Sequence, residues 1–300
     1  MNFNSQQSKE PHYHTHRFKA MGGPCEIHYL TVKEKSNSFN TLLENEVRRL
    51  ESKYSRYLSH SVTSQINRAH QSPLQVDEET AGLLNYAAIA FQQSDGLFDI
   101  TSGVLRSVWD FKKEIVPLQK QVEKVLKNIG WDKVLWDSQG RRIQLKPNME
   151  IDFGGLVKEY AADCVASLAR DEGIESGYVN LGGDISIIGA KITDQGELPW
   201  LLGIRDPDQP DKVKATISVL TGGLASSGDY ERFFVKNNHR YCHIFNPTTG
   251  WPCEGVAGVS VLSANCLTAG TLTTIAMLKG FEKGKVWLES NEVEFLIFAR

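Results

Sequence analysis

Ile151-Asp152-Phe153-Gly154-Gly155-Leu156-Val157-Lys158-Glu159-Tyr160 is the stretch of the sequence that most constrains the fold. Apolar residues continue from it at helical spacing, so we expect a helix from about residue 155 to residue 170. Two glycines at its start expose main-chain N–H groups at the positive end of the helix dipole, which favours a bound anion. Lys158, one turn into the helix, adds a positive charge. The alternative is an ordinary strand-to-helix connection in which Asp152 caps the helix.

Two more helices and several strands are expected around this helix. Apolar residues recur at three- and four-residue intervals from Phe39 to Tyr54, and a second helix fits Glu78 to Gln93. Strand-like runs occupy residues 25–30, 177–181, 185–188, 200–204, 215–220, 256–262 and 293–298. Successive strands with only a few helices between them indicate an α+β fold, with a mixed or antiparallel sheet and flanking helices.

The chain is expected to form a single domain over residues 17–300, with two lobes that meet at a cleft. No repeat, low-complexity tract or Pro-rich linker divides it. Residues 1–16 are polar and are expected to form a flexible tail. Three alternating histidines in this segment, His12, His14 and His16, can bind a metal ion adventitiously, although we favour a solvated tail.

Composition excludes several classes of protein. The 300 residues carry 33 Lys and Arg against 36 Asp and Glu, so no overall basic field is available to bind nucleic acid. No apolar run is long enough for a transmembrane helix, and the polar start lacks the apolar core of a signal peptide, so we expect a cytoplasmic protein. The five cysteines are widely spread and include no CxxC pair, which argues against a zinc ribbon and favours reduced thiols.

Motif searches exclude the commonest nucleotide and hydrolase sites. There is no GxGxxG, no HExxH and no GxSxG. Residues 223–228 have the glycine spacing of a P-loop, but Asp229-Tyr230 stands where Lys followed by Ser or Thr is required. A nucleoside triphosphatase of this type is therefore excluded.

Polar, glycine-rich clusters remain as candidate site segments. Residues 18–23 form either an ordinary turn or a place where a ligand approaches the backbone closely. Asp99 lies in an apolar run and needs a partner for its carboxylate; the alternative is that Asp99 or Thr101 caps a helix. His243 lies in a strand-like run that ends in a turn at residues 246–250, and a structural role is the commoner one for a single histidine. Its imidazole is nevertheless a natural general base for a hydroxyl group.

Taken together, these clusters resemble the ApbE family of flavin transferases, the FAD:protein FMN transferases. The resemblance runs from about Phe18 to Gly280, and the matching segments, in the family's order, are 18–22, 55–57 with 66–67, 98–105, 151–160, 179–184, 225–230 and 243–252. It implies one α+β domain that binds FAD and Mg²⁺ in a cleft between two lobes. It also implies transfer of FMN, through a phosphoester, to a Ser or Thr of an acceptor flavoprotein, with release of AMP. The implied acceptor is a subunit of a sodium-pumping or Rnf-type redox complex, or a soluble FMN-binding domain.

The resemblance also assigns roles to individual positions. It makes His243 the general base, and it places metal contacts on the Gly155 carbonyl and the Thr274 hydroxyl. The family's flavin and adenine contacts fall on Met21, Tyr57, Leu97, Phe98, Asp99, Asp152, Lys158 and Ile244.

The match departs from the family at the metal site. Where the family has a pattern like A-D-A-L-x-T-A, residues 269–276 read AGTLTTIA, so Gly270 replaces the first aspartate and Thr273 takes the second position. Mg²⁺ usually takes at least one carboxylate ligand. We therefore expect weaker, FAD-dependent Mg²⁺ binding, and we expect Gly270→Asp to tighten it. The alternatives are an FAD-binding protein without transfer activity, or an FAD pyrophosphatase that yields FMN and AMP.

Overall fold

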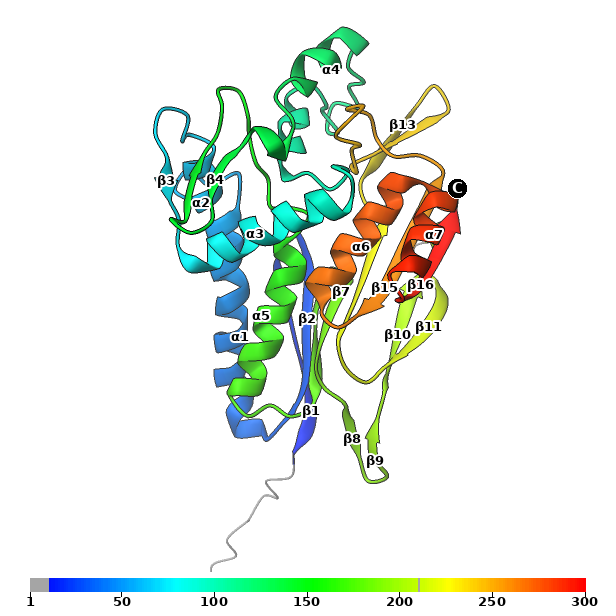
Figure 1. The fold of residues 1–300 in the computed structure, drawn as a ribbon. Coiled ribbons are helices and arrows are strands. Elements are labelled where there is room, and N and C mark those ends of the chain that lie inside the picture. The colour runs from blue at the N-terminus through cyan, green and yellow to red at the C-terminus, as the bar shows by residue number, and fades with distance from the viewer. Residues whose placement is uncertain (1–10, 210) are drawn as a thin grey trace, which may run out of the picture.

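An antiparallel sheet of seven strands forms the centre of the molecule (Figure 1). The computed structural model describes residues 11–209 and 211–300. The strand order is β1-β2-β6-β7-β12-β15-β16, and each neighbouring pair is antiparallel. The bounds are β1 His12–Ala20, β2 Gly23–Thr31, β6 Gly177–Leu181, β7 Asp184–Gly189, β12 Gly223–Gly228, β15 Val256–Ser263 and β16 Glu294–Ala299.

Helices cover one face of this sheet. Figure 1 shows α1 (Lys33–Tyr54) beside α5 (Val157–Asp171), and α6 (Cys266–Lys279) beside α7 (Phe281–Ser290). A further helix, α3 (Glu78–Gln93), crosses near α1, α5 and α6, and the Tyr86 hydroxyl on it donates to Thr271 Oγ1 over 3.0 Å. The main hydrophobic core lies between these helices and the sheet.

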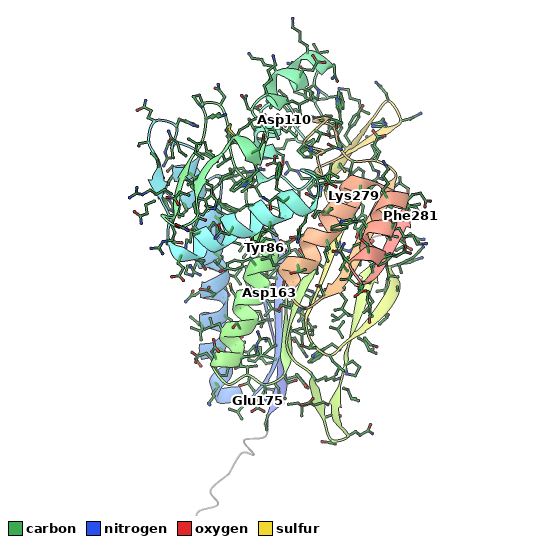
Figure 2. The ribbon with its side chains drawn as sticks, in the orientation of Figure 1. Tyr86, Asp110, Asp163, Glu175, Lys279 and Phe281 are labelled. Carbon is green, nitrogen blue, oxygen red and sulfur yellow. The ribbon has the colours of Figure 1, made fainter. Side chains whose placement is uncertain are left out.

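The packing of α5 against α6 is fixed by a side chain. Asp163 lies on α5 (Figure 2). Both of its carboxylate oxygens accept hydrogen bonds from the first turn of α6, from Cys266 N and Leu267 N, each over 2.9 Å. Main-chain N–H groups at a helix start have no partner within the helix, so this carboxylate satisfies two of them. The two helices are thereby held in one register.

The opposite face of the sheet is covered by a two-stranded ribbon, β10 (Trp200–Arg205) and β11 (Val213–Val219). Its apolar residues form a second hydrophobic cluster with those of β7 and β12, comprising Ile185, Ile187, Trp200, Leu202, Ile204, Val219 and Leu224. This cluster gives both faces of the central strands an apolar cover.

A smaller lobe lies above one end of the sheet. It contains the 3₁₀ helix η1 (Ile100–Ser107), α4 (Gln119–Leu126), β13 (Phe233–Lys236) and β14 (His239–Cys242), and its core comprises Val104, Leu105, Trp109, Ile129 and Phe234. Trp109 Nε1 donates to the Gly250 carbonyl over 2.9 Å and ties η1 to the loop after β14. The remaining short elements are α2 Val62–Ile66, β3 Leu74–Gln75, η2 Trp131–Lys133, β4 Leu135–Asp137, β5 Arg142–Gln144, β8 Lys191–Thr193 and β9 Gly196–Leu198.

The predicted α+β fold with flanking helices is confirmed, and the sheet pairings between the described strands are antiparallel rather than mixed. The helix that we expected from residue 155 begins at Val157. No helix within the described ranges is both long enough and apolar enough to span a membrane. The five cysteines are all free thiols.

The prediction of a flexible tail through residue 16 is wrong for residues 12–16. They belong to β1, because their backbone pairs with β2, and two of their side chains have partners on α1. His14 Nε2 lies 3.1 Å from Asn40 Nδ2, and His16 Nε2 lies 2.7 Å from Glu44 Oε2. The side chains of His14 and His16 therefore have partners on α1, and within residues 11–209 and 211–300 no three acidic, His or Cys side chains cluster as metal ligands. Residues 1–10, the rest of the expected tail, lie outside the described residues.

Candidate functional site

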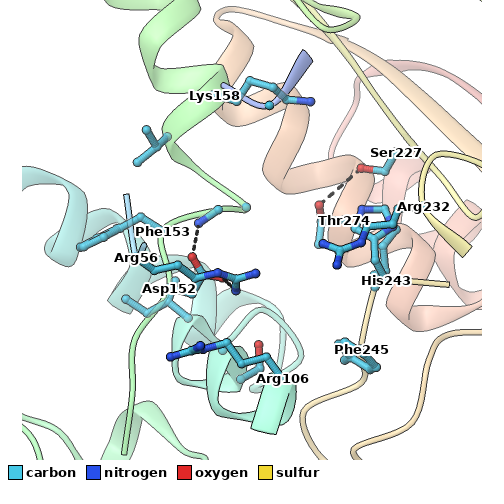
Figure 3. Close-up of a pocket in the computed structure, with 18 of the residues that line it drawn as sticks. Arg56, Arg106, Asp152, Phe153, Lys158, Ser227, Arg232, His243, Phe245 and Thr274 are labelled. Atoms are coloured by element: carbon cyan, nitrogen blue, oxygen red, sulfur yellow. Dashed lines mark hydrogen bonds and ion pairs between the residues drawn. The ribbon is translucent and has the colours of Figure 1, made fainter. Parts of the chain in front are cut away.

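A cavity of about 690 Å³ lies where the two lobes meet (Figure 3). Its walls come from the β1–β2 turn, the end of α1, the start of η1, the start of α5, the end of β12, the segment after β14, and α6. This volume is within the usual range for a small-molecule site. Segments far apart in the sequence thus converge on one site.

Most of the sequence-predicted site residues line this cavity. Those that do are Met21, Tyr57, Leu97, Phe98, Asp99, Asp152, Gly155, Lys158, His243, Ile244 and Thr274. Gly270 and Thr273 are the two that do not. The predicted residues therefore meet in space, with the exception of the two positions where the sequence departs from the family pattern.

One rim of the cavity is the tight turn between β1 and β2. Met21 and Gly22 have φ values of 53° and 77°, and Met21 donates its N–H to Glu51 Oε1 over 2.7 Å. The left-handed conformation is unfavourable for a residue with a side chain, so the turn is held by its surroundings. It presents the Met21 side chain to the cavity at a fixed position.

Tyr57 stands at the mouth of the cavity with 75% of its surface exposed. Arg56 Nη2 donates to its hydroxyl over 2.9 Å, and this hydrogen bond lowers the pKa of Tyr57. The guanidinium carbon of Arg56 also lies 5.0 Å from the centre of the Tyr57 ring. A large aromatic ring is therefore oriented at the entrance and left free to stack on a ligand.

The start of α5 is arranged differently from the expected anion site. Asp152 forms an ion pair with Arg56, and its Oδ1 accepts the Gly154 N–H over 3.0 Å. The N–H groups of Leu156 and Val157 both donate to the Phe153 carbonyl over 2.9 Å. The Gly154 N–H is thus already occupied by Asp152, although this contact precedes the helix and the N-cap of α5, Leu156, makes no side-chain capping hydrogen bond.

Asp99 lines the cavity but its carboxylate is used within the fold. It accepts the Thr101 N–H over 2.8 Å, the Thr101 hydroxyl over 2.7 Å and the Trp131 N–H over 3.1 Å. Burial raises its pKa. The capping alternative is therefore confirmed for Asp99, and three hydrogen bonds fix the start of η1 against the cavity.

The charge of Lys158 is compensated rather than free. Its Nζ lies 2.7 Å from Oδ2 of Asp184, which is 2% exposed. Two further carboxylates in the cavity wall, Glu159 and Glu231, also act on this ammonium group. Burial raises the pKa of both of them, and the neighbouring Asp184 adds to the effect on Glu159. This corner of the cavity is rich in carboxylates instead of being a cationic phosphate site.

His243 follows β14 and faces the open cavity. The side chain is open to the cavity, and its partial burial among the walls, with the positive charges of Arg232 and Lys158, lowers the pKa of His243 to about 4. The imidazole is consequently neutral near pH 7 and able to accept a proton. Figure 3 shows His243 beside Arg232, Ser227 and Thr274, across the cavity from Arg56 and Asp152.

The two adjacent threonines of α6 point in different directions. Thr274 faces the cavity, with its Oγ1 3.4 Å from Ser227 Oγ. Thr273 is fully buried, where its hydroxyl donates to the Gly270 carbonyl over 2.8 Å and lies 2.8 Å from Ser227 Oγ. Thr273 and Gly270 therefore do not face the ligand space, and the prediction that placed them at the metal is not supported by the geometry.

Sequence reasoning gave no role to several charged residues of the cavity, namely Glu51, Arg56, Arg106, Glu159, Glu231 and Arg232. Arg56 and Glu159 lie within two of the segments that match the family, 55–57 and 151–160. The sequence of these segments does not indicate which of their side chains face the ligand. Arg106 directly follows the cluster that ends at residue 105, and nothing in the sequence marks it.

Comparison with known proteins agrees with this geometry. Residues 21–297 match the model of the ApbE family. The chain is 27% identical over 272 residues to the FAD:protein FMN transferase of Vibrio cholerae, covering 88% of this chain and 80% of that protein. It is 30% identical over 223 residues to the FAD:protein FMN transferase of Escherichia coli K12, covering 71% and 63%.

Solved structures give the same result. The crystal structure of the ApbE protein from Thermotoga maritima superposes with a TM-score of 0.88 at 33% identity and covers 96% of this chain and 94% of that one. The flavin transferase ApbE from Vibrio cholerae superposes with a TM-score of 0.81 at 26% identity, with the same coverage. With the family match over nearly the whole chain, the conclusion is that this chain belongs to the ApbE family.

Proposed function

We propose that this chain is an FAD:protein FMN transferase that moves FMN from FAD to a Ser or Thr hydroxyl of an acceptor flavoprotein and releases AMP. The observation that carries the proposal is that His243 lines a cavity of about 690 Å³, which is large enough for a dinucleotide. The names of the similar proteins from Vibrio cholerae and Escherichia coli support the same activity.

The cavity offers contacts to the rings of FAD and to its phosphates. Met21, Tyr57 and Phe98 offer apolar or aromatic surface to the rings. Arg106 and Arg232 offer positive charge to the phosphates, with the Arg232 guanidinium carbon 5.2 Å from the centre of the Phe111 ring. We assign the phosphate contacts mainly to Arg232, because Asp184 already neutralises Lys158 and Glu150 pairs with Arg106 over 2.9 Å.

His243 is proposed to act as the general base. It takes the proton of the acceptor hydroxyl while the hydroxyl oxygen forms a bond to the phosphorus of the FMN half. The P–O bond to the AMP half breaks, and AMP leaves with the electron pair of that bond. The cavity holds the imidazole unprotonated at neutral pH, so no proton must first be removed from it.

Mg²⁺ is proposed as the metal that assists this transfer, and the donors in the cavity fit it. The Thr274 hydroxyl and the Gly155 carbonyl, the two positions assigned by resemblance, both belong to residues of the cavity wall. A buried carboxylate oxygen without a hydrogen-bond partner, Oε2 of Glu159, lies in the same wall. When bound, the ion would offset negative charge on the phosphates.

The proposed activity is tested with the purified chain, FAD, Mg²⁺ and an FMN-binding domain that carries a target threonine. Flavin fluorescence of the acceptor band on a denaturing gel supports the proposal, and an acceptor whose target threonine is changed to alanine should stay dark. Free FMN and AMP without a labelled acceptor would indicate the pyrophosphatase instead. Intact FAD retained on the protein would indicate a flavin-binding protein without transfer activity.

The role of His243 needs its own variant. His243→Ala should abolish labelling of the acceptor but leave FAD binding, followed by flavin fluorescence, within about threefold of the unmodified chain. Full labelling by this variant would contradict the assignment of His243 as the base.

A further inference from the structure

A buried carboxylate in the cavity wall has no role in the proton transfer assigned to His243. Glu159 on α5 is 8% exposed, and its Oε2 has no hydrogen-bond partner among the described residues. Burying a polar oxygen without a partner is unfavourable, and more so when the oxygen carries charge. Such a group is retained where a ligand supplies the missing contact.

The register of α5 against α6 places Glu159 opposite Gly270. Asp163 caps the start of α6 at Cys266, and one helical turn away along each helix Glu159 faces Gly270. A Cβ built on Gly270 would lie 2.5 Å from Glu159 Cγ and 2.9 Å from its Oε1. The Glu159 side chain therefore fills the space that a side chain at position 270 would need.

The charges around Glu159 favour a cation. Three carboxylates, those of Glu159, Asp184 and Glu231, act on the single ammonium group of Lys158. Lys158 forms its ion pair with Asp184 over 2.7 Å, so one ammonium group is shared among three carboxylates. An additional positive charge at this corner would be stabilised by the excess of carboxylates over ammonium groups.

Other oxygen donors lie on α6 and in the turn that precedes α5. Thr274 is one turn beyond Gly270 on α6, and Gly155 is one turn before Glu159. Ser227 Oγ lies 3.4 Å from Thr274 Oγ1. Hydroxyl, carbonyl and carboxylate oxygens are the donors that Mg²⁺ prefers.

We propose that Glu159 of α5 supplies the carboxylate ligand of the divalent cation in this chain, in place of a side chain at position 270 of α6. This inference rests on the proposed Mg²⁺-assisted transfer and assigns a ligand to it. It replaces the expectation that glycine at position 270 leaves the metal site without a carboxylate. The carboxylate ligand is thus contributed by α5 instead of by α6.

The test is direct metal binding by the full chain, with Mn²⁺ as the probe and electron paramagnetic resonance as the readout of free Mn²⁺. Glu159→Gln should weaken Mn²⁺ binding by about tenfold or more. It should not lower the melting temperature of the metal-free protein, because it removes a buried unpaired carboxylate. Glu51→Gln is the matched control: this carboxylate also lines the cavity, at the Met21 rim, and its loss should leave the Kd for Mn²⁺ within about twofold.

A second variant moves the carboxylate back to α6. Glu159→Gly combined with Gly270→Asp should bind Mn²⁺ within about threefold of the unmodified chain, because it keeps one carboxylate in the same space. If Glu159→Gln does not fold, the Mn²⁺ affinity of this exchange variant still tests the proposal. A folded Glu159→Gln protein with unchanged Mn²⁺ affinity would overturn the proposal, as would a folded exchange variant that binds Mn²⁺ no better than Glu159→Gln.

Failure of this inference can be told from failure of the proposed function. FAD binding to the metal-free chain, measured by flavin fluorescence, addresses the function alone. Absent FAD binding would count against the transferase. Normal FAD binding with Mn²⁺ affinity independent of Glu159 would count against the ligand assignment only.

Discussion

His243 donates its main-chain N–H to the carbonyl oxygen of Arg232 over 3.0 Å, and the two side chains face the cavity from the same wall (Figure 3). The guanidinium charge disfavours a second positive charge on the imidazole, and together with burial it lowers the pKa of His243. The arginine thus helps to keep the proposed base unprotonated.

The first prediction follows from that charge. Arg232→Gln removes a positive charge beside His243, so the pKa of His243 rises from about 4 and the imidazole becomes protonated at higher pH. The acidic limb of kcat/KM against pH should move to higher pH, with a further loss of about two- to fivefold at pH 5 relative to pH 7.

Arg106→Gln provides the control for this prediction. Arg106 lines the same cavity but is not among the charges that act on His243. Its variant should lower FAD affinity without moving the acidic limb. Identical pH profiles for the two variants would show that Arg232 does not set the protonation of His243.

The second prediction separates the two threonines of α6. Thr274→Val removes a hydroxyl from the cavity and should weaken Mn²⁺ binding several-fold, with a change in the free energy of unfolding below about 0.5 kcal/mol. Thr273→Val removes a buried hydroxyl that bonds to the Gly270 carbonyl and Ser227, and should destabilise the protein by about 1–2 kcal/mol.

Calorimetric or spectroscopic melting and Mn²⁺ titration measure both effects. The opposite result would contradict the prediction. If Thr273→Val weakened Mn²⁺ binding and Thr274→Val lowered the free energy of unfolding, Thr273 would be the threonine of α6 that faces the ligand.

The third prediction concerns Gly270 itself. Gly270→Ala should destabilise the protein by about 1–3 kcal/mol, because its Cβ would collide with Glu159 Cγ in a packed contact between α5 and α6. Gly270→Asp carries the same Cβ, so as a single change it should also destabilise the protein. This replaces the expectation from the sequence that it would simply tighten Mg²⁺ binding.

Gly82→Ala is a matched helical control. No atom lies within 4 Å of a Cβ at Gly82 on α3, so this change should stabilise the protein by up to about 1 kcal/mol. Denaturant unfolding of the two variants gives the comparison. Equal stability of Gly270→Ala and Gly82→Ala would contradict the contact between Gly270 and Glu159.

The fourth prediction addresses the mouth of the cavity. Tyr57→Ala should weaken FAD binding by about three- to tenfold, the effect of losing one stacked aromatic ring, with little change in melting temperature because the ring is exposed. Tyr57→Phe keeps the ring and loses only the hydroxyl that Arg56 contacts, so FAD affinity should stay within about twofold. Equal losses in both variants would assign the effect to the hydroxyl instead.

Some features of this protein follow from short stretches of the sequence. Helix α3 runs from Glu78 to Gln93 as predicted, because Asp77 caps its start by accepting the Thr80 N–H and the chain turns left-handed at Asp95 and Gly96. The strand at 177–181 is also confirmed. Such signals act between residues a few positions apart, so the sequence states them directly.

The sequence by itself determined the helices α1, α3 and α5, most of the central strands, the family to which the chain belongs and most of the residues that meet in the cavity, but it did not predict α6 and α7. Only the tertiary structure decided that Asp184 holds Lys158, that Thr274 rather than Thr273 faces the cavity, and that Glu159 fills the space beside Gly270. The reason is physical. Hydrogen bonds along the backbone and turn conformations depend on neighbouring residues, whereas the partner of a buried charge depends on how α5, α6 and the sheet pack, and that packing joins residues far apart in the chain.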